Sequence, residues 1–191
     1  SLNSADLGEG VETIGPEAFA YSGLVDIVIP ASVTELGSEA FEYCSRLNTV
    51  VINAQITVLR EYTFYGSSVH SVTLPAGLEE IEDSVFAYCS NLTEIEIPST
   101  VTYLGESAFE YSGLISVEIP GSIEEIPEDA FASCEFLETV ILHEGTTYIG
   151  YDAFGDCYKL KNVTLPVGLE EIGGDAFYGC TSLGEIVIPA G

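Results

Sequence analysis

The chain has 191 residues, 47% apolar and 18% charged, which supplies enough apolar material for a core and excludes an acidic disordered tail. Its 31 acidic residues against 4 Lys and Arg give a formal net charge of −27. A surface of this sign repels nucleic-acid phosphates and anionic lipid headgroups. We therefore exclude nucleic-acid binding, and direct membrane binding by this segment.

Phenylalanine recurs along the whole chain at intervals of 22 or 23 residues, and Ala precedes it in most cases. A turn follows, either in a short Tyr-Ser-Gly-Leu form or in a longer form that carries Cys and one extra residue. The turn absorbs the insertion while the flanking pattern stays in phase, as expected of a loop between fixed elements. Such a period predicts a stack of similar units. The positions are Phe19, Phe41, Phe64, Phe86, Phe109, Phe131, Phe154 and Phe177.

After each turn comes the motif Leu-x-x-Val/Ile-x-Ile/Leu, usually followed by Pro. Apolar and polar residues alternate in its last four positions, which predicts a short β-strand that the proline ends. The start of the chain is in phase with the motif and gives nine motifs in all. The expected strands in the later units are 26–29, 49–52, 71–74, 94–97, 116–119, 139–142, 162–165 and 185–188.

A second apolar pair, spaced by three residues, follows each strand, as in Val33 and Leu36 or Leu78 and Ile81. A glycine often comes next and marks a bend. The Ala-Phe segment after the bend is compatible with one turn of helix or with an irregular corner. Because one unit cannot bury its own apolar stripe, stacked units are expected to share a core, with one parallel strand per unit. The sequence therefore predicts eight to nine units and one parallel β-sheet.

We assign residues 1–191 to a single solenoid. The chain contains no Met, and neither end shows the atypical unit that normally caps a solenoid. We therefore expect a fragment of a longer protein that lacks both caps. Exposed terminal strands make end-to-end self-association another expectation.

The recurring pattern Ala-Phe-x-x-Cys-x-x-Leu-x-x-Val/Ile-x-Ile/Leu-Pro resembles the BspA-like, or Treponema pallidum type, leucine-rich repeats. The resemblance covers essentially the whole chain, with a weaker unit at Phe64, where Tyr65-Gly66-Ser67-Ser68-Val69 replaces the cysteine turn. It implies an α/β-type repeat solenoid that is right-handed and gently curved. It also implies a surface-exposed or secreted protein with a role in adhesion or host interaction.

The outward side chains of the strands are the candidate binding residues. Neighbouring strands lie about 4.8 Å apart, so Glu94, Glu96 and Glu118 are expected to face the same way on adjacent strands. They form either a patch for a basic partner or a divalent cation, or an ordinary solvated face of an acidic protein. The predicted partner-binding residues are Asp26, Val28, Thr49, Val51, Thr73, Glu94, Glu96, Glu118, Ile141 and Thr164.

The cysteines all stand three residues after a phenylalanine and therefore form one column, namely Cys44, Cys89, Cys134, Cys157 and Cys180. Serines fill the remaining places, which indicates a small, inward-facing position. Side chains in a stacked column point the same way, so we expect five free and mostly buried thiols. Pairing among Cys134, Cys157 and Cys180 stays open, because these three belong to successive units. No histidine joins the column, and no metal site is expected.

A column of tyrosines stands two residues after the phenylalanines and contains Tyr21, Tyr43, Tyr88 and Tyr111. Stacked tyrosines can hold the face of a sugar, or they can simply pack the turn and direct their hydroxyls to water. His70 and His143 lie three units apart, too far for one metal or one catalytic base, and both are expected at the surface.

Enzyme motifs are absent from the sequence, including the nucleophile elbow, the phosphate-binding loop and the His-Glu-x-x-His zinc motif. We therefore predict no catalytic residue and no cofactor. The leading hypothesis is a non-enzymatic module of an extracellular or cell-surface protein. It would bind a host or cell-surface protein or glycan, basic partners included. The alternatives are spacer repeats that present another domain, and an accessory region of a larger surface enzyme.

Overall fold

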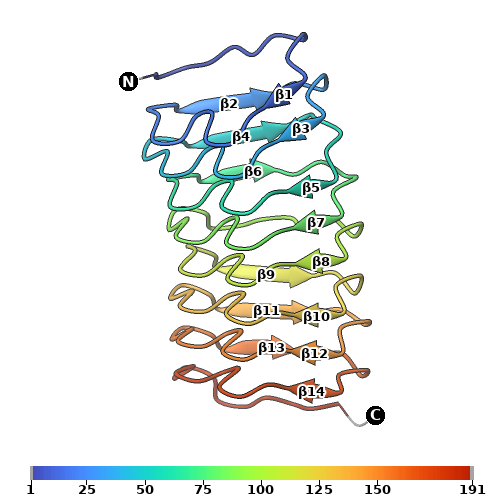
Figure 1. The fold of residues 1–191 in the computed structure, drawn as a ribbon. Helices are drawn as coiled ribbons and strands as arrows, with labels where there is room; N and C mark the ends of the chain where they lie inside the picture. The colour runs from blue at the N-terminus through green and yellow to red at the C-terminus, as the bar shows by residue number, and fades with distance from the viewer. Residues whose placement is uncertain (1, 190–191) are drawn as a thin grey trace.

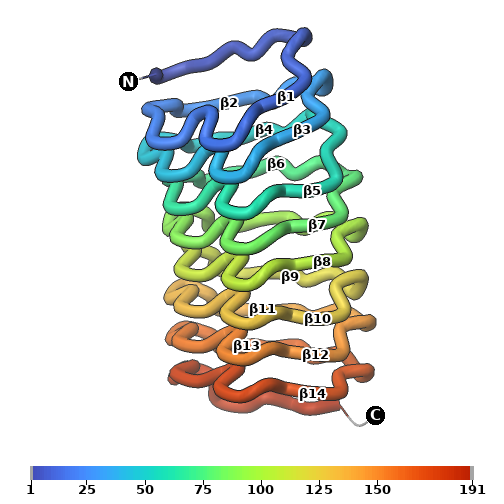
Figure 2. Tube along the Cα trace, in the orientation of Figure 1, coloured from blue at the N-terminus to red at the C-terminus, as the bar shows by residue number. Residues whose placement is uncertain are grey.

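The computed structural model describes residues 2–189 and shows about seven flattened turns stacked one on another (Figure 1). Successive turns keep the same outline from the first to the last (Figure 2). One wall of the stack consists of the long strands, which occupy predicted positions and pair in parallel. They are β2 (Asp26–Ile29), β4 (Thr49–Ile52), β6 (Ser71–Thr73), β9 (Ser116–Ile119), β11 (Thr139–Leu142) and β13 (Asn162–Thr164).

A second column of parallel strands lies along the opposite wall, so the expectation of one sheet was wrong (Figure 1). Each of its strands has only two residues, and the second residue is the last member of the apolar pair, directed into the core. Two residues cannot display an alternating pattern, which is why the sequence did not indicate a strand here. These strands are β1 (Thr13–Ile14), β3 (Glu35–Leu36), β5 (Val58–Leu59), β7 (Glu80–Ile81), β8 (Tyr103–Leu104), β10 (Glu125–Ile126), β12 (Tyr148–Ile149) and β14 (Glu171–Ile172).

The Ala-Phe segment forms an irregular corner, and the described residues contain no helix. Two residues of each corner, two before and two after the phenylalanine, have positive φ, as at Glu39 (57°) and Tyr43 (49°). This alternation turns every second N–H toward the following turn. Phe41 N–H, for example, donates to the Thr63 carbonyl at 2.8 Å. Hydrogen bonds between turns thus compensate a conformation that is otherwise unfavourable for residues with a Cβ. The chain is a β-solenoid, and the α/β assignment is corrected accordingly.

The recurrent phenylalanines form a spine through the core. From Phe19 to Phe177 their rings stack in sequence, with centroids 5.1–5.4 Å apart and planes within 12° of parallel. The six central rings are fully buried. Each repeat contributes one ring, and the distance between neighbouring turns therefore sets the distance between neighbouring rings of the spine.

The cysteines form the predicted column beside the spine, and all five thiols are free. Each sulfur donates to the carbonyl of the phenylalanine in the preceding turn, as Cys134 Sγ does to Phe109 O at 3.1 Å. Ser112 Oγ lies 3.2 Å from the same sulfur. Burial raises the pKa of Cys134 to about 12, so this thiol stays protonated and serves as a weak donor in the core.

The number of paired turns is smaller than expected. The first motif, near Leu7, and the last, near Ile186, form no strand in the described residues. Both residues pack only partly buried against the core. The structure thus shows about seven complete turns, fewer than the eight to nine units expected, although eight phenylalanine corners stack in the spine. The predicted handedness and curvature stay predictions.

Candidate functional site

The predicted columns on the long-strand wall are confirmed residue by residue where the strands pair. Val28 is registered with Val51, and Val51 with Thr73. Farther along the stack, Glu118 is registered with Ile141, and Ile141 with Thr164. Side chains at these positions point away from the core because alternate residues of a strand face opposite sides.

The ladder of long strands is interrupted at one internal turn, the segment Glu94–Ile97. This segment lies where a strand was predicted, between β6 and β9, but it is not a paired strand. Among the described residues, no backbone hydrogen bond joins it to either neighbour. The nearest one runs from Ile115 N–H to Thr93 O at 3.0 Å. The prediction that Glu94, Glu96 and Glu118 lie on adjacent paired strands was therefore wrong for the first two.

The short-strand wall is also discontinuous near this turn. Its strands fall into separate sheets, one ending at β8 and the next beginning at β10. In the inward column, Ile97 retains 7% exposure and Ile119 none, while Leu74 on the preceding turn is only partly buried. The strand walls of this turn are thus unpaired with those of the next turn, whereas its corner stays joined through bonds such as Phe109 N–H to Ala130 O at 2.8 Å.

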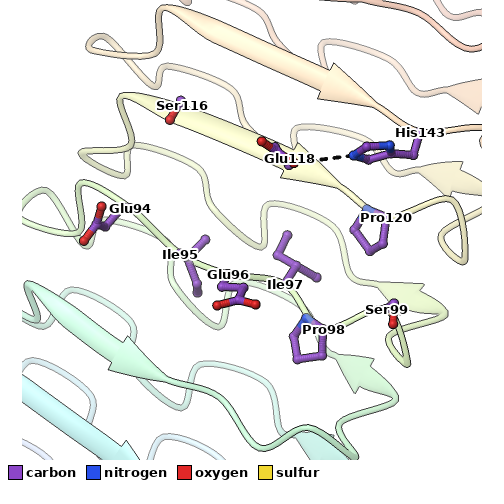
Figure 3. A pocket seen from close by; sticks show the side chains of 10 residues that line it. All are labelled: Glu94, Ile95, Glu96, Ile97, Pro98, Ser99, Ser116, Glu118, Pro120 and His143. Atoms are coloured by element: carbon purple, nitrogen blue, oxygen red, sulfur yellow. Dashed lines mark ion pairs between the residues drawn. The ribbon is translucent and has the colours of Figure 1, made fainter.

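A groove of about 540 Å³ opens between this segment and β9 (Figure 3). Glu94 and Glu96 come from the segment, Glu118 from β9, and His143 from the end of β11. Pro98 and Pro120 close one end of the groove, and neither has an N–H to donate across it. A second recess of about 350 Å³ lies on the other side of the segment, against Ser71 and Val72. The structure thus brings the three glutamates to one groove, although not through strand pairing.

The electrostatics of the groove are strongly one-sided. All three glutamates are exposed. The only ion pair at the groove among the described residues joins Glu118 to His143, at 3.5 Å between Oε2 and Nε2, and it needs a protonated imidazole. The lysine and arginine ion pairs of the described residues lie elsewhere, at Arg60–Glu82 and Lys161–Glu138. Repulsion between the carboxylates opposes close approach of the segment and β9, whereas Ser71 and Thr73 on the β6 side carry no charge, so repulsion accounts for the missing ladder on one side only.

Exposed or half-exposed apolar side chains occur farther along the wall that carries the acidic groove. Val28 is 54% exposed, and Val51 and Ile141 are half-buried. Asp26, Thr49, Thr73 and Thr164 complete the predicted set and are all at least partly exposed. The wall therefore offers an acidic centre with apolar and hydroxyl-bearing residues on either side.

The tyrosine column is a ladder of five rings rather than four. Tyr43 and Tyr65 are 5.4 Å apart, and Tyr65 and Tyr88 are 5.3 Å apart. In the weaker unit Gly66 occupies the column position, where a Cβ would come within 2.6 Å of the Tyr43 ring. Tyr65, one residue earlier, supplies the missing ring. Sequence reasoning overlooked it because the ring is displaced by one position. Burial and a hydrogen bond with Tyr43 raise the pKa of Tyr65 to about 12.

The remaining chemistry-bearing residues give no further site. His70 and His143 are both exposed, as expected. In the described part of the chain, no group of three or more His, Cys, Asp or Glu is placed to hold a metal ion. No helix there is long and apolar enough to cross a membrane.

Comparison with known proteins finds leucine-rich repeat sequences and structures. A sequence model described as the BspA type leucine-rich repeat region (6 copies) matches residues 12–138 and 124–191. No curated protein matches the chain. A leucine-rich repeat protein of Bacteroides ovatus superposes with a TM-score of 0.65 at 26% identity, over 95% of this chain and 65% of that one. The Treponema pallidum leucine-rich repeat protein gives 0.63 at 27% identity, over 96% and 77%. The pneumococcal vaccine antigen PcpA shares the fold, with a TM-score of 0.52 at 21% identity, over 93% and 54%.

Proposed function

We propose that this chain, which belongs to the BspA-type leucine-rich repeat family, is a non-enzymatic binding module of a surface-exposed or secreted bacterial protein. It binds a basic segment of another protein through its long-strand wall and has an adhesive role. The acidic groove, formed by Glu94, Glu96 and Glu118 beside the unpaired segment Glu94–Ile97, is the centre of this contact.

One observation carries the proposal. The internal turn at which the long-strand ladder opens is the same turn that concentrates outward glutamates. A solvated acidic face requires no such opening, and here the charges coincide with a groove whose backbone is unpaired. An acidic surface also attracts a basic partner from a distance and accelerates the encounter at low salt.

The mode of contact follows from the outward side chains. The neighbouring turns stay one strand spacing apart, as the bond from Ile115 N–H to Thr93 O at 3.0 Å shows, so an extended peptide lies across the outer face of the groove rather than between the turns. Glu94 and Glu96 are two residues apart and face the same way, so alternate lysine or arginine side chains of such a peptide meet them. Ile141, which is registered with Glu118 on the next strand, adds apolar contact beside the groove, and Val51 lies two turns before the segment on the same wall.

The test uses a fluorescent lysine decapeptide as the probe, with binding followed by anisotropy at several salt concentrations. Wild-type protein is expected to bind it, with affinity that falls steeply as salt rises. The triple variant Glu94→Lys/Glu96→Lys/Glu118→Lys is expected to lose the interaction.

A matched control, Glu79→Lys/Glu124→Lys/Glu170→Lys, makes the same change of net charge on another part of the solenoid. These three glutamates are exposed near the short strands. The control is expected to keep wild-type affinity within about threefold, because local contacts rather than net charge dominate at close range. Equal loss in both triples, or no binding by the wild type at low salt, would reject the groove as the site and favour a spacer role.

A further inference from the structure

The tyrosine ladder stops at Tyr111, and a pocket of about 300 Å³ opens beside its last rings. Tyr111 stacks on Tyr88 with centroids 4.7 Å apart and planes 17° from parallel. In the next turn, the equivalent position holds Ser133 in place of a tyrosine. Among the described residues no other ring stacks on Tyr111, so the place of the next ring is open and one face of Tyr111 has no partner ring.

The walls of this tyrosine notch combine apolar and polar groups. Tyr88, Tyr111 and Phe136 provide the rings, while Ser90, Ser133 and Glu135 provide hydroxyl and carboxylate groups. Phe136 is 49% exposed and is covered on one side by the Lys159 ammonium, 4.4 Å from the ring centroid. The notch is therefore a ring-sized recess beside an unpartnered aromatic face, with hydrogen-bonding groups at its margin.

Backbone packing makes the notch a preformed part of the fold. Gly113 lies on its floor, and a Cβ at this position would collide with the carbonyl oxygen of Ser90. Ser112 is buried, with Oγ 3.2 Å from Cys134 Sγ. The floor is thus fixed by main chain and core contacts and needs no rearrangement to admit a ligand.

We propose that the tyrosine notch is a sugar-binding subsite, which takes an uncharged, glucose-configured pyranose ring stacked on the free face of Tyr111. The aromatic face carries partial negative charge and attracts the axial C–H groups of a pyranose. In the glucose configuration the hydroxyls are equatorial, so they project from the ring edge toward Ser133 and Glu135. This site lies on the phenylalanine corner of the coil and is separate from the acidic groove.

Charge and polarity distinguish this ligand from its rivals. Glu135, which lines the notch, and a net charge of −27 disfavour uronic or sialic acids and outweigh the Lys159 ammonium, which is held against the Phe136 ring. An aromatic side chain of a partner protein would fill the same space but would leave the surrounding serine and glutamate groups without partners. A neutral pyranose satisfies both the ring face and the polar margin.

The test is titration of ¹⁵N-labelled protein with methyl β-D-glucopyranoside, followed by amide chemical shifts. The amides of Gly113, Ser133 and Glu135 are expected to shift along a saturable curve. Methyl β-D-glucuronide, which differs by one carboxylate, is expected to bind more weakly by about tenfold, which corresponds to about 1.4 kcal/mol. N-acetyl-L-tyrosinamide is the probe for the aromatic alternative.

Two variants locate the ligand on the ladder. Ser133→Tyr extends the ladder into the notch and is expected to fold, because Tyr88 and Tyr111 adopt the same positive φ as Ser133. This variant should bind the glucoside about tenfold or more weakly than the wild type, because the sugar loses roughly one aromatic stacking contact. Tyr21→Ser, at the opposite end of the ladder, should leave binding unchanged.

The proposal is overturned by unchanged glucoside binding in Ser133→Tyr, by equal binding of the glucuronide, or by tyrosinamide binding without glucoside binding. The triple variant of the acidic groove should bind the glucoside like the wild type, so the two proposals stand or fall separately.

Discussion

Replacing one ring of the phenylalanine spine should destabilise the whole solenoid. Phe86 is fully buried and stacks on Phe64 at 5.4 Å and on Phe109 at 5.3 Å. Truncation to alanine leaves a cavity that two neighbouring turns share and cannot easily close. Buried Phe→Ala changes cost about 3–5 kcal/mol. For a chain of this length, each kcal/mol lowers Tm by about 2–4 °C, which gives a shift of about 6–20 °C.

The assay is thermal unfolding followed by circular dichroism, with two reference variants. Phe86→Leu keeps much of the apolar volume but removes two ring contacts, so about 1–3 kcal/mol is expected from two stacks of 0.5–1.5 each. Phe177→Ala removes a partly buried ring with a single stacking partner, Phe154, and should cost less than Phe86→Ala. Equal shifts for Phe86→Ala and Phe177→Ala, or less than about 1 kcal/mol for Phe86→Ala, would refute the role of the spine.

Three other predictions concern charge, thiols and the repeat. Burial and neighbouring carboxylates raise the pKa values of Glu110 and Asp129, so the folded state binds protons more tightly than the unfolded state. The stabilisation from these two carboxyls should therefore be complete at a pH below their pKa values in the unfolded state. It should be lost as pH rises through their pKa values in the folded state. Tm should thus increase as pH is lowered from 8 to about 5, and a flat or opposite profile contradicts this. In the native protein at pH 8, a thiol reagent should modify the part-buried Cys180 well before Cys134, whereas all five thiols react in denaturant; early reaction of Cys134 would be inconsistent with its burial. Deletion of residues 64–85 joins two turns in phase and should give a folded protein by circular dichroism, whereas deletion of half that segment should not; the reverse outcome would reject the repeat boundaries.

The sequence predicted the features that each turn repeats with a clear residue pattern. The phenylalanine spine, the cysteine column and the long strands follow from period and alternation, because identical positions in a solenoid must stack. The outward columns could be assigned as well, and the register of Val28, Val51 and Thr73 confirms them.

Other features depend on contacts that periodicity does not encode. The two-residue strands exist only because a neighbouring turn pairs with them. Positive φ at residues such as Glu39 and Tyr43 is stabilised by hydrogen bonds to the next turn rather than by a local glycine. The opening at Glu94–Ile97 was missed because the segment has the alternation of a strand, and whether a strand pairs depends on the adjacent turns as well as on its own residues.

The acidic groove and the tyrosine notch lie on different surfaces of the same rigid stack. We propose the groove for basic protein segments and the notch for a neutral sugar ring. A module with both surfaces would have two separable routes to attachment. Each proposed site is formed where one turn departs from its neighbours.

The most direct measurement is hydrogen exchange of the backbone amides, with and without the lysine decapeptide. In the free protein, segment 94–97 should exchange at least about tenfold faster than the paired segments 49–52 and 139–142, because its N–H groups have no partners. Addition of the decapeptide should slow exchange in segment 94–97 and leave the short strands unaffected. Equal protection of all three segments in the free protein, with no change on addition of the peptide, would contradict the open ladder and the binding groove together.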